Sequence, residues 1–296
     1  MDHRPRLEDV AARVGVSTAS ASLVLRGVPG PSAETRRRVL AAAAELGYRA
    51  DRTASLLARR RRHLLGVVLD VRNPFHAELV EEIQVEADRV GYEVVLATLS
   101  RTHDEQRAIT SLLDFRCEAV LLLGPDTADA ALDELAARVP VVAIGRRVKG
   151  SAVDVVRSAD HVGVAEALTH LIDLGHRRIA FVDGGRGAVA SARRRGYREA
   201  MRRAGLDPLV VPGDHTEEGG ILAGRMLAAA PDRPSAVVAS NDRCAVGLLD
   251  AFVRAGLEVP RDVSLVGYDD STLARLVHID LTTVNQDAPS QAVHAV

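Results

Sequence analysis

The sequence predicts an α/β protein in which a small helical head precedes a large core of doubly wound parallel sheets. Three observations lead to this prediction. Apolar residues near the N-terminus recur at helical spacing, and from His63 onward short β-rich runs alternate with helical stretches. The composition, 47% hydrophobic and 26% charged over 296 residues, is that of a globular chain long enough for one large unit and a small appendage.

Three helices are expected in the head. Gly15 has the permissive backbone that ends a first helix, and Ser17 can cap a second one after a short turn. Ser32 can cap the third helix, which Gly47 ends. The apolar residues expected to form its core are Leu7, Val10, Ala11 and Val14, then Ala21, Val24 and Leu25, then Val39, Ala42, Ala43 and Leu46. Two helices joined by a three-residue turn and packed on a third can place one helix in a DNA major groove.

The charge of the chain is divided unevenly at Arg62. Residues 1–62 hold 13 arginines and six acids, a net charge of +7, and the remaining residues carry a net charge of −9. A basic head on an acidic body suggests that the head meets a polyanion, for which nucleic acid is the natural candidate. The alternative is a solvated, charged terminus without a partner.

Short apolar runs mark the strands of the core. The first series is LLGVVLD, EVVLA, AVLLL and VVAI, separated by helical stretches over 75–90, 103–115 and 127–138. A second series begins near Asp160 with IAFV, LVV, AVVA and SLVG, and Gly175, Gly205 and Gly256 end its helices. Two similar halves place a cleft between two lobes, at the carboxyl ends of the strands, where open α/β sheets bind ligands.

Residues at the strand ends and in the loops that follow are the candidates for contact with a ligand. They are Phe75, Arg146, Asp160, Arg193, His215, Asp242, Asp269 and Gln286. A guanidinium and inward carboxylates make forked hydrogen bonds to vicinal hydroxyls, and Phe75 can cover an apolar sugar face. This chemistry favours a sugar or a similar polar metabolite. The alternatives are a structural salt bridge for Arg193 and Asp242, a core position for Phe75 and a helix cap for Asp269.

Other classes of protein find little support. The two cysteines do not make a disulfide framework, the charged N-terminus has no secretory signal, and no apolar run is long enough for a membrane span. The sequence contains no Walker A run and no H-E-x-x-H, and no Gly-x-Gly-x-x-Gly follows the first strand. The ten histidines are dispersed. We therefore expect a cytoplasmic protein that is not an enzyme and has no cofactor, metal site or membrane contact.

Many segments together resemble the lactose-repressor-type (LacI/GalR) family of transcription regulators. In the head they are LEDVAARVGVSTASASLVLRG, PSAETRRRVLAAAAELGY and ASLLA at 54–58. In the body they are NPFHAELVEEI, LIDLGHRRIAFVDG, SARRRGY, SNDRCAVGLLDAF, VPRDVSLVGYDDS and LTTVNQD. Because these segments keep the family's order over essentially the whole chain, the resemblance is far more specific than any single motif. It implies a helix-turn-helix head and a two-lobed core like a periplasmic binding protein.

The resemblance implies that a helix from about Thr18 to Leu25 reads the major groove. Thr18, Ala19 and Leu23 stand at the positions that face base edges, and Leu23 replaces the arginine of many members. Without a guanidinium or amide these three residues contact thymine methyls at most, so we expect weak direct readout. Arg26, Ser17, Ser22 and Thr35 are assigned to phosphate oxygens, with helix capping or plain exposure as the alternative for the serines.

The segment before Arg62 resembles the family's hinge helix. The resemblance implies that Leu57, paired with its twin in a dimer, enters the minor groove and kinks the duplex. Ala50 and Asp51 stand where members often have Pro-Asn, which loosens the entry to the hinge. The alternatives are packing of Leu57 on the body and a merely solvated run for the four arginines 59–62.

The prediction is a homodimeric repressor of transcription that binds double-stranded operator DNA and senses a small effector, a sugar or similar metabolite. The reverse sign, in which the effector promotes DNA binding, is the alternative. We divide the chain into a helix-turn-helix domain (1–48), a hinge and basic linker (49–62) and an effector-binding core (63–296). Lobe 1 spans about 63–158 plus 289–296, and lobe 2 spans about 159–288.

Two further expectations complete this prediction. Because family members continue past LTTVNQD, we expect the sequence to be truncated at its C-terminus. The competing function is a cytosolic sugar-binding or transport-associated protein without specific DNA binding, which accounts for the body but leaves the basic head unused.

Overall fold

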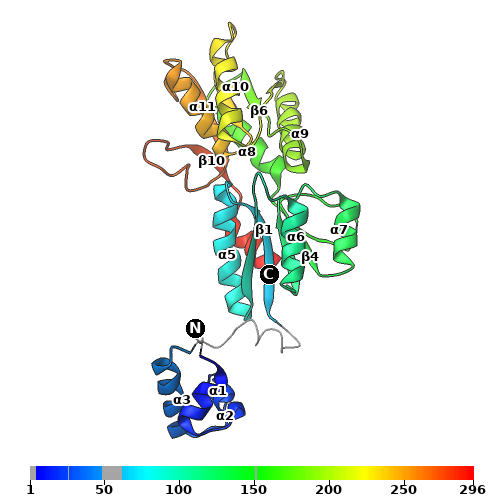
Figure 1. Ribbon diagram of the computed structural model, residues 1–296. Coiled ribbons are helices and arrows are strands. Elements are labelled where there is room, and N and C mark those ends of the chain that lie inside the picture. The colour runs from blue at the N-terminus through cyan, green and yellow to red at the C-terminus, as the bar shows by residue number, and fades with distance from the viewer. Residues whose placement is uncertain (1–4, 26, 49–61, 151) are drawn as a thin grey trace. The chain divides into compact units, whose positions relative to one another are not determined.

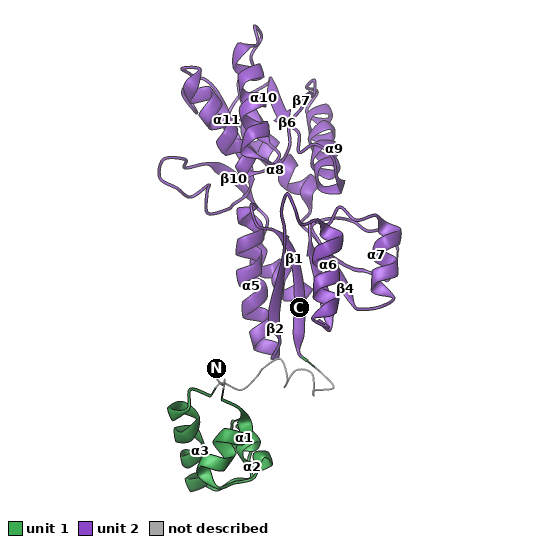
Figure 2. Cartoon of the chain, in the orientation of Figure 1, with its two compact units in different colours: residues 1–62 green, residues 63–296 purple. Residues whose placement is uncertain are grey.

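The computed structural model describes residues 5–25, 27–48, 62–150 and 152–296. The chain forms two compact units, residues 1–62 and residues 63–296 (Figure 2). In the described residues no helix combines the length and apolar character needed to cross a bilayer.

The first unit is a bundle of three short helices, α1 (Leu7–Val14), α2 (Thr18–Leu25) and α3 (Ala33–Glu45) (Figure 1). Gly15, at φ 70°, ends α1 in the left-handed conformation that glycine adopts without strain. Val10, Ala21 and Val39, one from each helix, are fully buried in a common core. The core predicted from the apolar spacing is therefore the one that forms.

The second unit begins with a five-stranded parallel sheet in the order β2-β1-β3-β4-β5. Its strands are β1 (Leu64–Asp70), β2 (Glu93–Leu99), β3 (Ala119–Leu123), β4 (Val141–Ile144) and β5 (Asp154–Val156). Its helices are α5 (Pro74–Val90), α6 (Glu105–Asp114), α7 (Asp129–Ala136) and α12 (Ala288–Ala295). Figure 1 shows α5 on one side of β1 and α6 on the other, so the sheet is covered on both faces.

A second parallel sheet has the order β10-β9-β8-β6-β7. Its strands are β6 (Ile179–Val182), β7 (Leu209–Val211), β8 (Ala236–Ala239), β9 (Ser264–Asp269) and β10 (Thr282–Asn285). Its helices are α8 (Asp160–Asp173), α9 (Ala188–Arg203), α10 (Glu217–Ala229) and α11 (Asp242–Arg254). One core joins α8 and α9 to one face of the sheet, and another core joins α10 and α11 to the other face.

The chain passes between the two lobes of the second unit twice. It leaves the first sheet after β5 and enters the second lobe at α8, then returns after β10 to α12, which packs against α5. Ala292 and Ala295 of α12 are buried in the first lobe's core. Two crossings allow the lobes to change their mutual angle while each sheet stays intact.

The predicted fold class is confirmed, because the structure has a three-helix unit and two parallel sheets with helices on both faces. Two strands, β5 and β10, were not predicted from the sequence. Both lie at an edge of a sheet, and most of their residues are half-buried or exposed. They are short, and neither shows the continuous apolar run that marks a fully buried strand.

Candidate functional site

Helix α2 has two opposite faces. Ala21 and Val24 are buried against the rest of the bundle. At a helical period of 3.6 residues, the opposite face consists of positions 18, 19, 22 and 23. Thr18 and Ala19 are exposed there, and Ser22 and Leu23 are half-buried. Four of the residues assigned to DNA contact therefore lie together on the outward face of one helix.

Two other assigned residues lie at helix starts. The Ser17 hydroxyl oxygen accepts a hydrogen bond from the backbone N–H of Ser20 at 3.1 Å, which caps α2. The Thr35 backbone N–H donates to the Ser32 hydroxyl at 3.2 Å in the first turn of α3. Capping orients these turns, and the N-terminal end of a helix favours an anion such as phosphate. Arg26 and Leu57 lie outside the described residues.

A cleft of about 250 Å³ lies between the two lobes of the second unit. The first lobe lines it with Asp70 at the end of β1, with Phe75 and His76 at the start of α5, and with Arg146 after β4. The second lobe lines it with residues that follow β6, β7, β8 and β10, with Asp269 at the end of β9 and with part of α9. The cleft therefore lies at the carboxyl ends of the strands, as expected for sheets of this type.

Six of the eight candidate ligand contacts line this cleft. They are Phe75, Arg146, Arg193, His215, Asp269 and Gln286. The side chain of Phe75 is 7% exposed and belongs to the core of the first lobe, so only part of its ring surface faces the cleft. Asp160 and Asp242 do not line it.

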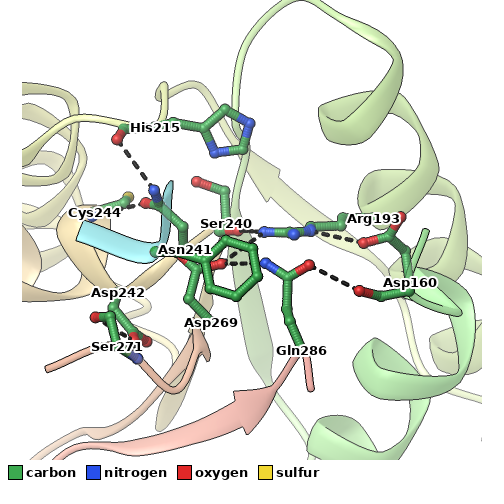
Figure 3. A network of polar contacts seen from close by, with 12 residues as sticks. Asp160, Arg193, His215, Ser240, Asn241, Asp242, Cys244, Asp269, Ser271 and Gln286 are labelled. Atoms are coloured by element: carbon green, nitrogen blue, oxygen red, sulfur yellow. Dashed lines mark hydrogen bonds and ion pairs between the residues drawn. The ribbon is translucent and has the colours of Figure 1, made fainter. Parts of the chain in front are cut away.

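Arg193 is the centre of a buried polar network (Figure 3). Its Nε donates to Asp160 Oδ1 at 3.0 Å, and its Nη1 donates to the backbone carbonyl of Ser240 at 2.6 Å. The same Nη1 lies 3.7 Å from Asp269 Oδ1, and the guanidinium carbon lies 3.7 Å from the centroid of the Tyr268 ring. Two carboxylates, a carbonyl and an aromatic face thus hold the guanidinium in one orientation at the cleft wall.

Asp269 and Gln286 extend the network toward the crossing segments. Gln286 Nε2 donates to Asp269 Oδ1 at 2.6 Å, and the Ser158 hydroxyl donates to Gln286 Oε1 at 2.9 Å. Burial raises the pKa of Asp269 to about 7, although the positive charge of Arg193 acts in the opposite direction. Ser158 and Gln286 lie on the two crossing segments, so the network joins the cleft to the place where the lobes meet.

Asp242 has an internal role. It begins α11 and is fully buried. Its carboxylate accepts hydrogen bonds from the backbone N–H and hydroxyl of Ser271, both at 2.8 Å, and from the Thr283 hydroxyl at 2.6 Å. These contacts hold the loop after β9 and strand β10 against α11. The structure places this carboxylate behind the cleft wall, where it supports the wall's shape.

Two histidines, one from each lobe, line the cleft in their neutral form. Burial lowers the pKa of His76 to about 4 and that of His215 to about 3, and the positive charge of Arg193 lowers the latter further. His76 Nδ1 accepts a hydrogen bond from the backbone N–H of Asp70 at 3.2 Å. With Nδ1 as acceptor, the neutral imidazole of His76 has its Nε2–H left to donate to a ligand hydroxyl.

Arg146 is held by its own lobe. Its Nη2 donates to the carbonyl of Thr127 at 2.5 Å, and its Nη1 lies 3.0 Å from Asp129 Oδ1. Its Nε is buried and has no hydrogen-bond partner among the described residues. A buried donor without a partner is costly, so this atom is a candidate contact for a ligand.

Several polar residues of the cleft were not found from the sequence. Asp70 ends the first strand, Arg186 follows a pair of glycines after β6, and Asn241 stands one position before Asp242. Each lies at a strand end, the signal that identified the other candidates. Gln291, in α12, carries no such signal, because it reaches the cleft through the packing of α12 on the first lobe.

The arrangement of the cleft suits a neutral or weakly charged polyol. Arginines, carboxylates, amides and neutral imidazoles share the lining with an apolar surface of comparable extent, and the polar groups donate and accept hydrogen bonds in many directions. Among the described residues no cluster of histidine, cysteine or acidic side chains has the geometry of a metal site.

Comparison with known proteins agrees with both units. Residues 6–51 match the model for bacterial regulatory proteins of the lacI family, and residues 168–296 match a periplasmic binding protein-like domain. The ribose operon repressor of Escherichia coli K12 is 35% identical over 290 residues, which cover 95% of this chain and 87% of that protein.

Solved structures extend the likeness to the whole chain. The lac repressor dimer bound to operator and the anti-inducer ONPF is 28% identical, with a TM-score of 0.84 over 99% of this chain and 91% of that one. The complex of the transcriptional regulator CelR with cellobiose is 35% identical, with a TM-score of 0.71 over 99% of this chain and 91% of that one.

Proposed function

The chain belongs to the lacI family of bacterial regulatory proteins, and from this premise we propose that it represses transcription as a homodimer on an operator until a carbohydrate enters the cleft. As a member of this family it is a DNA-binding transcriptional regulator. The operator, the effector and the residues that contact them are specific to this chain.

The outward face of α2 is the single observation that carries the proposal. A helix that buries Ala21 and Val24 and turns Thr18, Ala19, Ser22 and Leu23 outward has the shape of a recognition helix. Its neighbours α1 and α3 fix its orientation through a shared core. We propose that Thr18, Ala19 and Leu23 face the base edges.

Sequence readout by this helix is mostly apolar. A methyl group on Thr18 or Ala19 and the Leu23 side chain can contact thymine methyls, but none of them makes a bidentate pair with guanine or adenine. The helix starts at Ser17 and Thr35, together with Ser22 and Arg26, contact phosphates and set the register. Leu57 enters the minor groove, so the deformability of the operator contributes to specificity.

The effector we propose is a small carbohydrate. Arg193, Asn241 and Asp269 present charged and amide groups for vicinal hydroxyls, and the edge of Phe75 gives an apolar contact. A related structure holds cellobiose, and others hold sucrose or glucose. We propose Phe75, Arg146, Arg193, His215, Asp269 and Gln286 as direct contacts, with Asp160 and Asp242 as supports.

Coupling between effector and operator acts through the lobes. The network from Arg193 through Asp269 and Gln286 to Ser158 ends on the segments that cross between lobes. A ligand that stabilises one angle between the lobes changes the geometry at the first lobe, to which residues 49–62 connect the DNA-binding domain (1–48). A coupling free energy of ~1–3 kcal/mol is typical of such systems. Because its target is bacterial chromosomal DNA, we infer that the protein acts in the cytoplasm.

A gel-shift titration with DNA from the protein's own promoter region tests the proposal. A specific complex whose affinity falls steeply with salt supports it, because each phosphate contact releases counterions. Equal, weak binding to that DNA and to a random duplex of the same length contradicts it. A Leu23→Ala variant should lower affinity for the promoter DNA more than affinity for the random duplex.

The effector is tested by thermal shift with a panel of neutral mono- and disaccharides. A ligand selective for the folded state raises Tm. The ligand that raises Tm should also weaken the promoter complex. Arg193→Ala should abolish both effects, whereas Arg198→Ala, on the exposed side of the same helix, should leave both unchanged. Promoter binding that no sugar weakens would remove the effector part of the proposal.

A further inference from the structure

A second concavity, a groove of about 370 Å³, adjoins the cleft. Gly145, Arg146 and Ala188 line both. The cleft alone is slightly smaller than the ~300–1,000 Å³ of typical small-molecule sites, and the groove more than doubles the space open to a ligand. The ligand space therefore continues beyond the residues described above.

The groove is lined by cationic side chains from both lobes. Arg147 and Arg157 come from the first lobe and the crossing segment, and Arg195 comes from α9. Each of the three is exposed, and none forms an ion pair with any residue that the structure describes. His161, in the first turn of α8, adds an imidazole. Three guanidiniums around one concavity repel each other unless an anion lies between them.

The acidic groups of the groove do not cancel this charge. Asp160 lines the groove, but its carboxylate is bound to the guanidinium of Arg193, which compensates its charge. Glu199 lies 3.8 Å from Arg203, which partly compensates its charge. Gly196 of α9 allows α8 and α9 to approach closely at the groove, because a Cβ at that position would lie 2.9 Å from the Cα of His161 in α8. The groove is thus a built feature of the contact between α8 and α9, the helices on one face of the second sheet (Figure 1).

We propose that this groove binds a phosphoryl group, so that the effector is a phosphorylated carbohydrate whose sugar lies in the cleft. This inference rests on the proposed function for the sugar, but the groove itself is tested without it. Guanidinium groups match the oxygens of a phosphate bidentately, and several of them suit a dianion better than a carboxylate. Arg146, which lines both groove and cleft, lies where sugar and phosphate would join.

The first experiment measures the affinity of the full chain for inorganic phosphate by calorimetry, at constant ionic strength. The Arg157→Gln/Arg195→Gln double variant should bind at least tenfold more weakly than the parent chain, because it loses two charge-assisted contacts to the anion. Arg198→Gln is the matched control on α9, since Arg198 does not line the groove. The basic head is common to all variants, so any phosphate bound there does not alter the comparison. If the double variant and the parent chain bind equally well, the proposal is wrong.

The second experiment measures the affinities of the parent chain and the double variant for glucose and for glucose 6-phosphate. Any other neutral sugar that raises Tm is compared with its own phosphate ester in the same way. The ester should bind at least tenfold more tightly to the parent chain, and the double variant should lose this advantage while keeping its affinity for the neutral sugar. Equal affinities in the parent chain would overturn the assignment of the groove. If no neutral sugar binds the parent chain or releases it from the promoter, the proposed effector is wrong. Phosphate binding to the groove can still be measured in that case.

Discussion

Arg193 and Asp160 form an ion pair, with Nε 3.0 Å from Oδ1, and both side chains are about 95% buried. The two residues belong to neighbouring helices and lie 33 positions apart. Arg193 also faces the cleft, so one side chain joins the interior of the second lobe to the ligand space. Its removal is therefore expected to affect both stability and ligand binding.

Replacement of Arg193 by alanine is expected to destabilise the second unit by roughly 3–5 kcal/mol, because it leaves the buried carboxylates of Asp160 and Asp269 without their cation. Urea unfolding measures the change. Arg193→Ala/Asp160→Ala should recover part of the loss, since the uncompensated charge is then absent. Arg198→Ala serves as control, and a loss below 1 kcal/mol in Arg193→Ala would contradict the proposed role of the pair.

Acid is expected to destabilise the second unit through its two buried histidines. The pKa of His215 is lowered to about 3 and that of His76 to about 4. Between these values and the ordinary pKa of ~6.5, the unfolded chain binds more protons than the folded one, so the free energy of unfolding falls as the pH falls. The slope is ~1.4 kcal/mol per pH unit for each histidine.

Asp269 acts in the opposite direction. Its pKa is raised to about 7, so the folded chain binds the extra proton between pH ~3.9 and about 7, and this contribution to stability is lost as the pH rises through that window. Because Asp269 is present in both chains, the contribution of His215 is measured by comparing His215→Gln with the parent chain. The variant should show a flatter pH dependence of urea unfolding below pH ~6.5. An unchanged profile would show that His215 has the same pKa in the folded and unfolded chain.

Neighbouring positions of α2 are expected to separate DNA contact from folding. Leu23→Ala should weaken binding to promoter DNA with little change in the stability of the first unit, because Leu23 lies on the outward face. Val24→Ala removes a buried side chain and should destabilise that unit by ~0.5–3 kcal/mol. Gel shift and thermal unfolding are measured on both variants. Equal effects on both measurements would argue against an outward recognition face.

Replacement of Asp242 by alanine is expected to act on stability first. The substitution leaves the Ser271 backbone N–H and two hydroxyls without their acceptor, at a cost of ~1–3 kcal/mol for each buried group left unsatisfied. Sugar affinity per folded molecule should fall less than in Arg193→Ala. Calorimetric titration well below Tm separates the effect on sugar affinity from the effect on stability. If a folded Asp242→Ala variant binds no sugar, Asp242 is a direct contact.

Local patterns account for much of what could be predicted. The helices of the head were predicted because apolar residues within each helix, such as Val10 and Val14 of α1, recur at spacings that place them on one face, which is information held in a few neighbouring residues. The buried strands were found from their apolar runs. The edge strands β5 and β10 were missed because they are stabilised by pairing with one neighbour rather than by their own apolar content.

The candidate site shows where such inference ends. Arg193 and Asp242 both stand in segments that resemble the family, yet only Arg193 lines the cleft. Asn241, one position earlier, reaches the cleft in place of Asp242. A shift of one residue at a helix start turns a side chain by about 100°, and the tertiary packing decides which of the two faces the ligand.

The amino-acid order alone determined the alternation of strands and helices, the basic three-helix head and the family, because each depends on contiguous residues. Tertiary structure decided the partners, Arg193 with Asp160 and Gln286 with Ser158. It also gathered around one groove three arginines that form no ion pair within the described part of the chain. The charge and hydrogen-bond state of a side chain depends on groups brought close in space from distant positions, and local sequence does not encode those distances.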